Sequence, residues 1–300
     1  GTGFGVILGM VGRAATAENR SMTLGIATAA GSGGQIVGPP LAAWLLQSFH
    51  WSEVFLIFAV IIMAAMLVLP IMRAPAVATR AEAEETMSQM LGRAFRDPSY
   101  MLIFLGFFSC GYQLAFITAH FPAFVAELCG PIEPGSILSS MGITTTLELG
   151  AWAIGVIGLA NVAGTIYAGK LGARYSKKYL LAGIYTGRTI IAAVFILMPI
   201  TPLSVLIFSV LMGSLWLATV PLTSGLIAQI YGLRYMGTLY GIVFLSHQLG
   251  GFMGVWLGGA MYDAYGGYEV VWWIGIGVGA VSALVHLPIN ERRLLVPQAA

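Results

Sequence analysis

Three ionisable side chains lie inside long apolar stretches of this sequence, namely Arg188, His247 and His120. A guanidinium group can offer two parallel hydrogen bonds to a carboxylate. An imidazole titrates at about pH 6.5, so it can gain or lose a proton. Ionisable groups are costly in apolar surroundings, which makes each of these residues a candidate for function. No Asp or Glu lies in the middle of these stretches. The pattern therefore predicts a site that prefers anions to cations.

Each of the three residues also has a purely structural interpretation. Arg188 could extend along its helix toward water or bind backbone carbonyls. His247 could be a neutral residue that is hydrogen-bonded to a nearby helix. His120 precedes Pro122 by two positions, so it could act at an outer gate or proton entry, or it could bind backbone groups at a helix kink.

Further polar and aromatic residues occur in the same apolar stretches. Gln248 follows His247 and could orient a substrate or pack against a polar neighbour. The others could line a site or simply hold two helices together. They are Gln113, Tyr112, Trp216, Thr219, Thr223, Asn161 and Thr165.

Other kinds of chemistry find little support in the residues. The four histidines do not form a metal-ligand or haem pattern, and no Ser/His/Asp set can be assembled around one mid-stretch histidine without an acid. No phosphate-binding loop that ends in GK[ST] is present, and two cysteines are too few for a disulfide framework. The net charge of +2 gives no nucleic-acid signal. The sequence thus predicts no enzyme, cofactor, metal or nucleic-acid partner.

The composition predicts an all-α membrane protein. The chain is 58% hydrophobic and 9% charged with a mean hydropathy of +0.87, whereas soluble domains carry about 25% charged residues. Crossing a bilayer takes about 20 apolar residues as a helix, and the alternation typical of membrane barrels is absent. Nine segments fit, the first of them partial: 1–12, 21–47, 54–72, 99–126, 151–169, 179–198, 203–230, 237–262 and 269–288.

The loops between these segments predict an orientation. Of the 14 Lys and Arg residues, 13 fall in alternate loops and the C-terminal tail, and Arg188 is the exception. Positive loops face the cytoplasm, so the C-terminus is expected there. Several aromatic residues lie near segment ends, where interfacial rings are common, among them Tyr100 and Trp272.

The stretch 73–98 holds 8 of the 26 charged residues and indicates a water-exposed linker between two membrane blocks. Within it, 82–95 could form a surface helix or remain a solvated tether. The surface helix would place four residues on one face: Met87, Met90, Leu91 and Phe95. The chain begins at Gly1 inside an apolar run, which we interpret as a truncated N-terminus.

Two motifs resemble those of the major facilitator superfamily. The run GIATAAGSGGQIVGPPLAA looks like the fifth-helix motif of that family, with Ala42 and Ala43 in place of its closing glycines, and the matching residues are Gly25, Gly34, Gly38 and Pro39. The run GKLGARYSKK resembles the family's basic loop motif, although the usual acid is Ala173 and the second glycine is Ser176. Its matching residues are Gly169, Leu171, Arg174, Lys177 and Lys178.

The order of these motifs implies helices four to twelve of a twelve-helix transporter, without the first three. On this basis residues 1–72 are the rest of the N-terminal half (helices four to six), and 73–98 are the cytoplasmic linker. Residues 99–290 are the C-terminal six-helix half, and 291–300 are a cytoplasmic tail. The resemblance implies alternating access around a midplane site.

Longer runs resemble bacterial monocarboxylate porters and oxalate/formate antiporters, for example AFITAHFPAFVAELCG and RYMGTLYGIVFLSHQLGG. This resemblance implies a monomeric inner-membrane symporter or antiporter for a small organic anion, with protons or a counter-anion. His247 then falls on the cavity-lining eleventh helix, His120 on the seventh and Arg188 on the more peripheral ninth. Segment 151–169 lacks the ion pair or cation of those relatives. Efflux of hydrophobic compounds and a non-transporting sensor are the alternatives.

Overall fold

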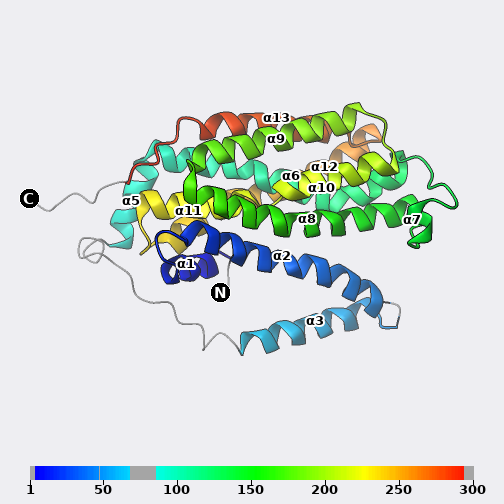
Figure 1. Ribbon diagram of the computed structural model, residues 1–300, viewed down its shortest axis with the longest axis horizontal. Helices are drawn as coiled ribbons and strands as arrows, with labels where there is room; N and C mark the ends of the chain where they lie inside the picture. Colours follow the sequence, from blue (N-terminus) through cyan, green and yellow to red (C-terminus); the bar gives the residue numbers. More distant parts are fainter. Residues whose placement is uncertain (1–3, 47, 68–85, 294–300) are drawn as a thin grey trace, which may run out of the picture.

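The computed structural model describes residues 4–46, 48–67 and 86–293. Most of the predicted linker (73–85), the first residues of the chain and the end of the tail (294–300) lie outside the described residues. The described part consists of helices and connecting turns (Figure 1). The helices are α1 (Phe4–Ala14), α2 (Arg20–Leu45), α3 (Trp51–Met66), α5 (Met87–Arg96), α6 (Pro98–Leu128), α7 (Ile137–Ser140), α8 (Thr146–Arg174), α9 (Lys177–Leu197), α10 (Pro202–Leu215), α11 (Thr219–Tyr231), α12 (Met236–Tyr265) and α13 (Glu269–His286).

Long, roughly aligned helices form a bundle in which α6 is a central element (Figure 1). It packs against α12, α13 and α8, while α8 also contacts α2 and α10, and α9 packs against α13. Five spans in the described part are long and apolar enough to cross a membrane: α6, α8, α9, the α10–α11 segment and α13. Many large apolar side chains are exposed, for example Leu197 and Leu203 at 69% and 67%. Such a surface suits lipid rather than water.

Each predicted segment overlaps one helix, except that the seventh is divided between α10 and α11. Proline has no backbone N–H, so Pro221 cannot bond to the carbonyl of Leu217. Val220 N donates to that carbonyl instead, at 3.0 Å. Leu217 N in turn donates to Asn161 Oδ1 on α8, at 2.8 Å. The break is therefore stabilised by a side chain from another helix.

The linker contains a helix in its described part. In α5, Thr86 Oγ1 accepts from Gln89 N and Gln89 Oε1 accepts from Thr86 N, which together form a capping box. Met90 is buried against the bundle, whereas Met87 and Phe95 are about half exposed. A surface helix is thus present over Met87–Arg96, with a narrower buried face than the sequence predicts.

Two of the expected interfacial aromatics are instead inside the protein. Tyr100 is fully buried, and its hydroxyl donates to Leu239 O at 2.9 Å. Trp272 is 3% exposed and packs among the rings of Phe116 and Phe208. Both residues lie near the end of a predicted segment, but this position in the sequence does not show that their rings face other helices.

Glycines set the closest approach between α6 and α12. A Cβ atom added at Gly250 or Gly254 would overlap backbone atoms of Phe108 or Tyr112, and one at Gly111 would overlap the backbone of His247. Small residues let two helices approach until their backbones touch. The result is a tight seam along most of α6.

The motif glycines make a second close contact, between α2 and α8. A Cβ added at Gly25 would lie 3.2 Å from the Cα of Gly169, and the reverse holds as well. At Gly34 and Gly38 an added Cβ would meet no atom of the described part of the chain within 4 Å. The close approach implied by the fifth-helix motif is therefore made at Gly25 and not at Gly34 or Gly38, and the side chain of Pro39 lies outside the description.

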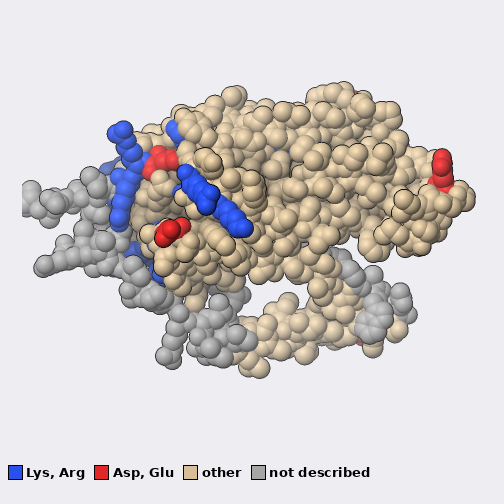
Figure 2. Space-filling view, in the orientation of Figure 1, with Lys and Arg blue, Asp and Glu red and all other residues tan. Residues whose placement is uncertain are grey.

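Charge is distributed unevenly along the bundle. Figure 2 shows Lys and Arg gathered at the end formed by α5 and the α8–α9 connection, where some acidic residues also lie, whereas the opposite end of this face shows acidic atoms and no Lys or Arg. We call these the basic end and the acidic end. Orientation in the bilayer remains a prediction of the positive-inside rule.

Candidate functional site

Arg188 lies inside the bundle, roughly 16 Å along α9 from its first residue. Its side chain is fully buried. Nη1 lies 3.6 Å from Cys110 Sγ on α6, and the guanidinium carbon lies 5.8 Å from the centre of the Tyr185 ring. The side chain therefore points into the protein and does not extend along the helix toward water.

The guanidinium group is only partly satisfied. Nε and Nη2 of Arg188 are buried and make no hydrogen bond in the described structure. No carboxylate of the described chain pairs with it, because the Asp and Glu residues lie near helix ends and in loops. A buried charge is costly without a partner. The two free N–H sites can therefore receive an anion.

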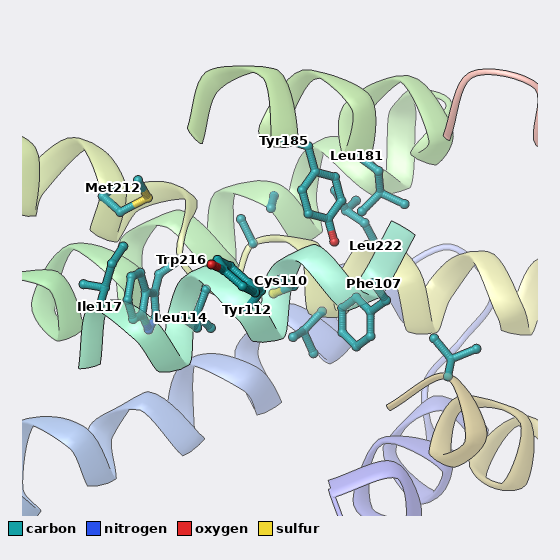
Figure 3. Close-up of a cluster of buried hydrophobic side chains, with 14 of the residues drawn as sticks. Phe107, Cys110, Tyr112, Leu114, Ile117, Leu181, Tyr185, Met212, Trp216 and Leu222 are labelled. Atoms are coloured by element: carbon teal, nitrogen blue, oxygen red, sulfur yellow. The ribbon is translucent and has the colours of Figure 1, made fainter. Parts of the chain in front are cut away.

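Cys110 connects this guanidinium to the broken helix. Its Sγ lies 3.3 Å from Oγ1 of Thr219, the first residue of α11. Figure 3 shows Tyr185 extending from α9 toward α6, where Cys110 lies. The hydroxyl groups of Tyr185 and Tyr240 are buried without a hydrogen-bond partner. The surroundings of Arg188 within the described residues thus offer further donors and no carboxylate.

His247 approaches the same thiol from α12. Its ring stacks on Phe244 with 4.9 Å between ring centres, and it interacts with Cys110. Nδ1 lies 3.3 Å from Gln248 Oε1, while Nε2 is buried without a hydrogen-bond partner. We call Arg188, Cys110 and His247 the central cationic site. Gln248 itself is exposed and contacts the site only through His247.

His120 does not join the central site. Its Nε2 lies 3.0 Å from Val255 O on α12, and the ring packs where a side chain at Gly258 would be. The contact joins α6 to α12 near the acidic end. A role at an outer gate or proton entry stays a prediction.

Gln113 binds a neighbouring helix as well. Its Nε2 donates to Gly275 O on α13 at 3.0 Å, and its Oε1 has no partner. It borders a cavity of about 10 Å³, which can hold at most one water molecule. Gln113 is therefore placed to orient helices or one water rather than an organic substrate.

Asn161 and Trp216 build the wall at the α10–α11 break. Asn161 Nδ2 donates to Ser32 Oγ on α2 at 2.7 Å, while its Oδ1 accepts from Leu217 N. Trp216 is 2% exposed and follows the last residue of α10; it lies near Met212 in the buried cluster (Figure 3). Both residues shape the surroundings of the site.

The sequence did not single out Cys110, Tyr185, Tyr240 or His286 for this centre. His286 is fully buried and stacks on Tyr185 with 5.0 Å between ring centres. Tyr185 could have been found, because it lies one turn before Arg188 and so shares its helix face. The position of Cys110 depends on contacts between distant helices, and it carries no local signal.

The described residues hold no cluster of three or more His, Cys, Asp or Glu side chains that could bind a metal ion. Cys110 and Cys129 are both free thiols. The central cationic site brings a guanidinium, a thiol and an imidazole together, and the described residues place no carboxylate beside them.

A helical bundle with several membrane-crossing spans and a buried cationic centre defines the class, a multi-pass membrane protein. The sequence model of the Major Facilitator Superfamily matches residues 1–255 and, in a second alignment, 134–299. The chain belongs to this superfamily, whose members are transporters and not enzymes.

Relatives agree with this assignment. The uncharacterized MFS-type transporter YcxA of Bacillus subtilis (strain 168) is 24% identical over 283 residues, which cover 90% of this chain and 64% of YcxA. The crystal structure of the E. coli fucose:proton symporter FucP matches with a TM-score of 0.66 at 14% identity, covering 95% of this chain and 73% of FucP. A structure of FucP in the outward conformation gives 0.67 at 16% identity, covering 95% of this chain and 72% of FucP. The chain thus spans about two thirds of the length of YcxA, and these structures show the fold alone.

Proposed function

We propose that the protein is a secondary active transporter of a small organic anion, with a monocarboxylate as the favoured substrate. The observation that carries this proposal is the fully buried Arg188, with two unpartnered N–H sites and no carboxylate nearby. A carboxylate bound there would satisfy both sites with parallel hydrogen bonds. The same centre would repel a cationic substrate.

His247 supplies a means of coupling. Its unpartnered Nε2 can bind a proton or accept a hydrogen bond from a protonated acid. A proton on the imidazole adds positive charge beside Arg188 and strengthens anion binding. Release of that proton on the other side of the membrane would weaken binding and free the substrate.

Alternating access would come from rocking of two halves, residues 1–72 and 99–290, joined by the linker 73–98. The basic end would face the cytoplasm of a bacterial cell, together with the C-terminus. The choice of a monocarboxylate is supported by the motif resemblance to monocarboxylate porters and oxalate/formate antiporters. YcxA carries no named substrate, and the substrate of FucP belongs to FucP.

The direct test is uptake of labelled lactate, pyruvate, formate and oxalate into liposomes that contain the intact protein, with and without an inward proton gradient. Accumulation driven by the gradient would support a proton-coupled carrier, and stimulation only by internal anion would support exchange. If none of the four acids moves, while hydrophobic cations or dyes do, the anion proposal is wrong and efflux replaces it.

Variants of the central site sharpen this test. Arg188→Ala should lower kcat/KM for the transported acid by about 30-fold or more, because truncating one partner of a buried charged contact commonly costs about 2–5 kcal/mol. The control is Arg96→Ala, since Arg96 is exposed on α5. Equal uptake by both variants would remove Arg188 from the site.

A second pair of variants addresses coupling. His247→Gln should leave uptake measurable but remove its dependence on pH between about 5.5 and 7.5, because the remaining amide cannot titrate in this range. His50→Gln is the control, since His50 is exposed and caps α3. An unchanged pH profile in the His247 variant would exclude His247 from proton coupling.

A further inference from the structure

A second cationic feature lies at the basic end, away from the central site. It is a cavity of about 180 Å³ between α2, α8, α9 and α11. Its lining includes Glu18, Arg20, Ser21, Ala173, Lys177 and Gln229. A single water needs about 10–15 Å³ by a comparable measure, so this space holds a multi-atom solute together with several waters.

Two positive side chains face this cavity from the first residues of two helices. Arg20 begins α2 and Lys177 begins α9. Arg20 Nε donates to Gly12 O at 3.0 Å, and Lys177 Nζ donates to Gln229 Oε1 at 2.8 Å. Neither cation forms an ion pair within the described residues, and the two repel each other. Helix N-termini add partial positive charge to that of the side chains.

Two carboxylates lie near these cations without forming an ion pair with either of them in the described residues. Glu18 lines the cavity but is exposed, and Glu291 attracts Lys177 from outside the lining. Neither carboxylate lies within ion-pair distance of Arg20 or Lys177 in the described structure. The lining therefore carries two cations against one exposed carboxylate, and neither cation is in a direct ion pair within the described residues.

A buried hydroxyl completes the set of donors. Ser21 is 5% exposed, and its Oγ has no hydrogen-bond partner. A Cβ added at Gly172 would lie 3.0 Å from this Oγ, and one at Gly225 would lie 3.2 Å from it. Glycine at both positions thus avoids a side chain that would crowd this hydroxyl. An oxygen-rich ligand could accept from Ser21 while it faces both cations.

We propose that this cavity binds a phosphate group, from either a phosphate-bearing solute or a lipid headgroup. Two cations, two helix N-termini and a free hydroxyl converge on one small volume, which suits the several oxygens of a phosphate group better than the two of a monocarboxylate. The position of Ala173 in the lining is consistent with this. A side chain with a carboxylate at that point would supply the missing negative charge from within the chain.

The ligand would join the helices at the end where they are already close. Arg20 and Ser21 belong to α2, and Lys177 belongs to α9, so a phosphate bound to all three bridges them. The contact of Gly25 with Gly169 lies one turn from Ser21 along α2. Bound phosphate therefore stabilises the closed basic end and opposes separation of α2 from α9. This proposal does not depend on the substrate of the central site.

The test is thermal unfolding of the intact purified protein in neutral detergent, with sodium phosphate compared with sodium acetate and sodium chloride at equal ionic strength. Phosphate should raise Tm by several degrees in a saturable way, because a ligand that binds only the folded state stabilises it. Arg20→Gln and Ser21→Ala should each lose this rise. Arg174→Gln should keep it, because Arg174 is exposed outside the cavity lining.

A variant could lose the phosphate-induced rise in Tm simply because it misfolds. A substitution that adds a negative charge to the cavity excludes this explanation. Ala173→Asp should raise the basal Tm and abolish the phosphate effect, since its carboxylate would occupy the same place.

Nanodiscs distinguish the two sources of phosphate. A solute site predicts a phosphate response in phosphatidylcholine discs, whereas a headgroup site predicts a higher Tm in phosphatidylglycerol discs that Arg20→Gln removes. An equal effect of acetate, or a phosphate rise retained in Arg20→Gln and Ala173→Asp, would overturn the proposal.

Discussion

The α6–α12 and α2–α8 contacts both rely on glycine, but they differ in extent. Along α6, hydrogen bonds with α12 occur at Tyr100, at Phe104 and at His120, so the contact runs from one end of the bundle to the other. The α2–α8 contact is closest at Gly25 and includes the bond between Ser32 and Asn161. Beyond that bond, a Cβ added at Gly33, Gly34 or Gly38 would meet no described atom within 4 Å.

This difference separates a fixed contact from one that can open. A seam with backbone contact along most of its length cannot change without loss of many interactions at once. A seam that is closed at one end and free at the other can rock with little repacking. We therefore expect α6 and α12 to move as one body and α2 to move against α8.

The largest expected effect follows from filling the α6–α12 seam. Gly254→Ala would place a methyl group onto the backbone of Tyr112, where no flexible side chain can yield. Overpacking of this kind costs about 1–3 kcal/mol and more where the backbone must shift. We expect a Tm at least several degrees lower in detergent, with a reduced yield of folded protein.

The control lies on the same helix. Gly259 would gain a methyl group with nothing within 4 Å. Gly259→Ala should be neutral or stabilising by up to about 1 kcal/mol, since alanine is the better helix former. An equal decrease in Tm in Gly254→Ala and Gly259→Ala would show that α12 needs glycine for helix flexibility and not for packing.

A smaller effect on stability, but a clear one on transport, is expected at the α2–α8 contact. Gly169→Ala brings a Cβ against the backbone of Ser21 and Gly25 and should push the basic end apart. The part of α2 beyond Ser32 is loosely packed, so α2 can move away from α8 without losing many contacts. Tm should therefore fall less than in Gly254→Ala, whereas uptake should be strongly reduced. Gly38→Ala is the matched control, and it should change neither quantity, because an added Cβ there would lie more than 4 Å from the atoms of the described residues. Normal uptake in Gly169→Ala would mean that the closed basic end is not needed in the transport cycle.

Much of the fold could be predicted because lipid imposes a simple rule. Apolar runs of sufficient length must be helices, and every predicted segment overlaps one. The rule gives no information on helix continuity. Pro221 was the available signal for the break in the seventh segment, but the break also needs Asn161, which is 56 residues from Leu217 in sequence.

The site was predictable only where a residue is conspicuous by itself. Arg188 and His247 stand out as ionisable groups in apolar runs, and the structure places both beside Cys110. Cys110 looks like an ordinary apolar helix residue, and its partner Thr219 lies 109 positions away. Such contacts depend on helix packing that no local pattern records.

The smallest expected effect is a difference in the rate at which the thiols of Cys110 and Cys129 are labelled. This difference tests whether α6 stays packed against its neighbours. Cys110 is fully buried at the central site, whereas Cys129 follows the end of α6 and is partly buried. Burial raises the pKa of the Cys129 thiol above its usual range. Because the thiolate is the reactive form, N-ethylmaleimide should label Cys129 slowly near neutral pH, and its rate should keep rising above about pH 8.5.

Cys110 should remain unlabelled over the same pH range in the absence of substrate, since α6, α9 and α11 enclose it. Mass spectrometry of the Cys110→Ser and Cys129→Ser variants would assign each rate. Labelling of Cys110 that appears only when a transported acid is present would show that the cycle opens the central site. If Cys110 reacts as fast as Cys129 without substrate, the helices around it are not fixed, and the distinction between the two seams is wrong.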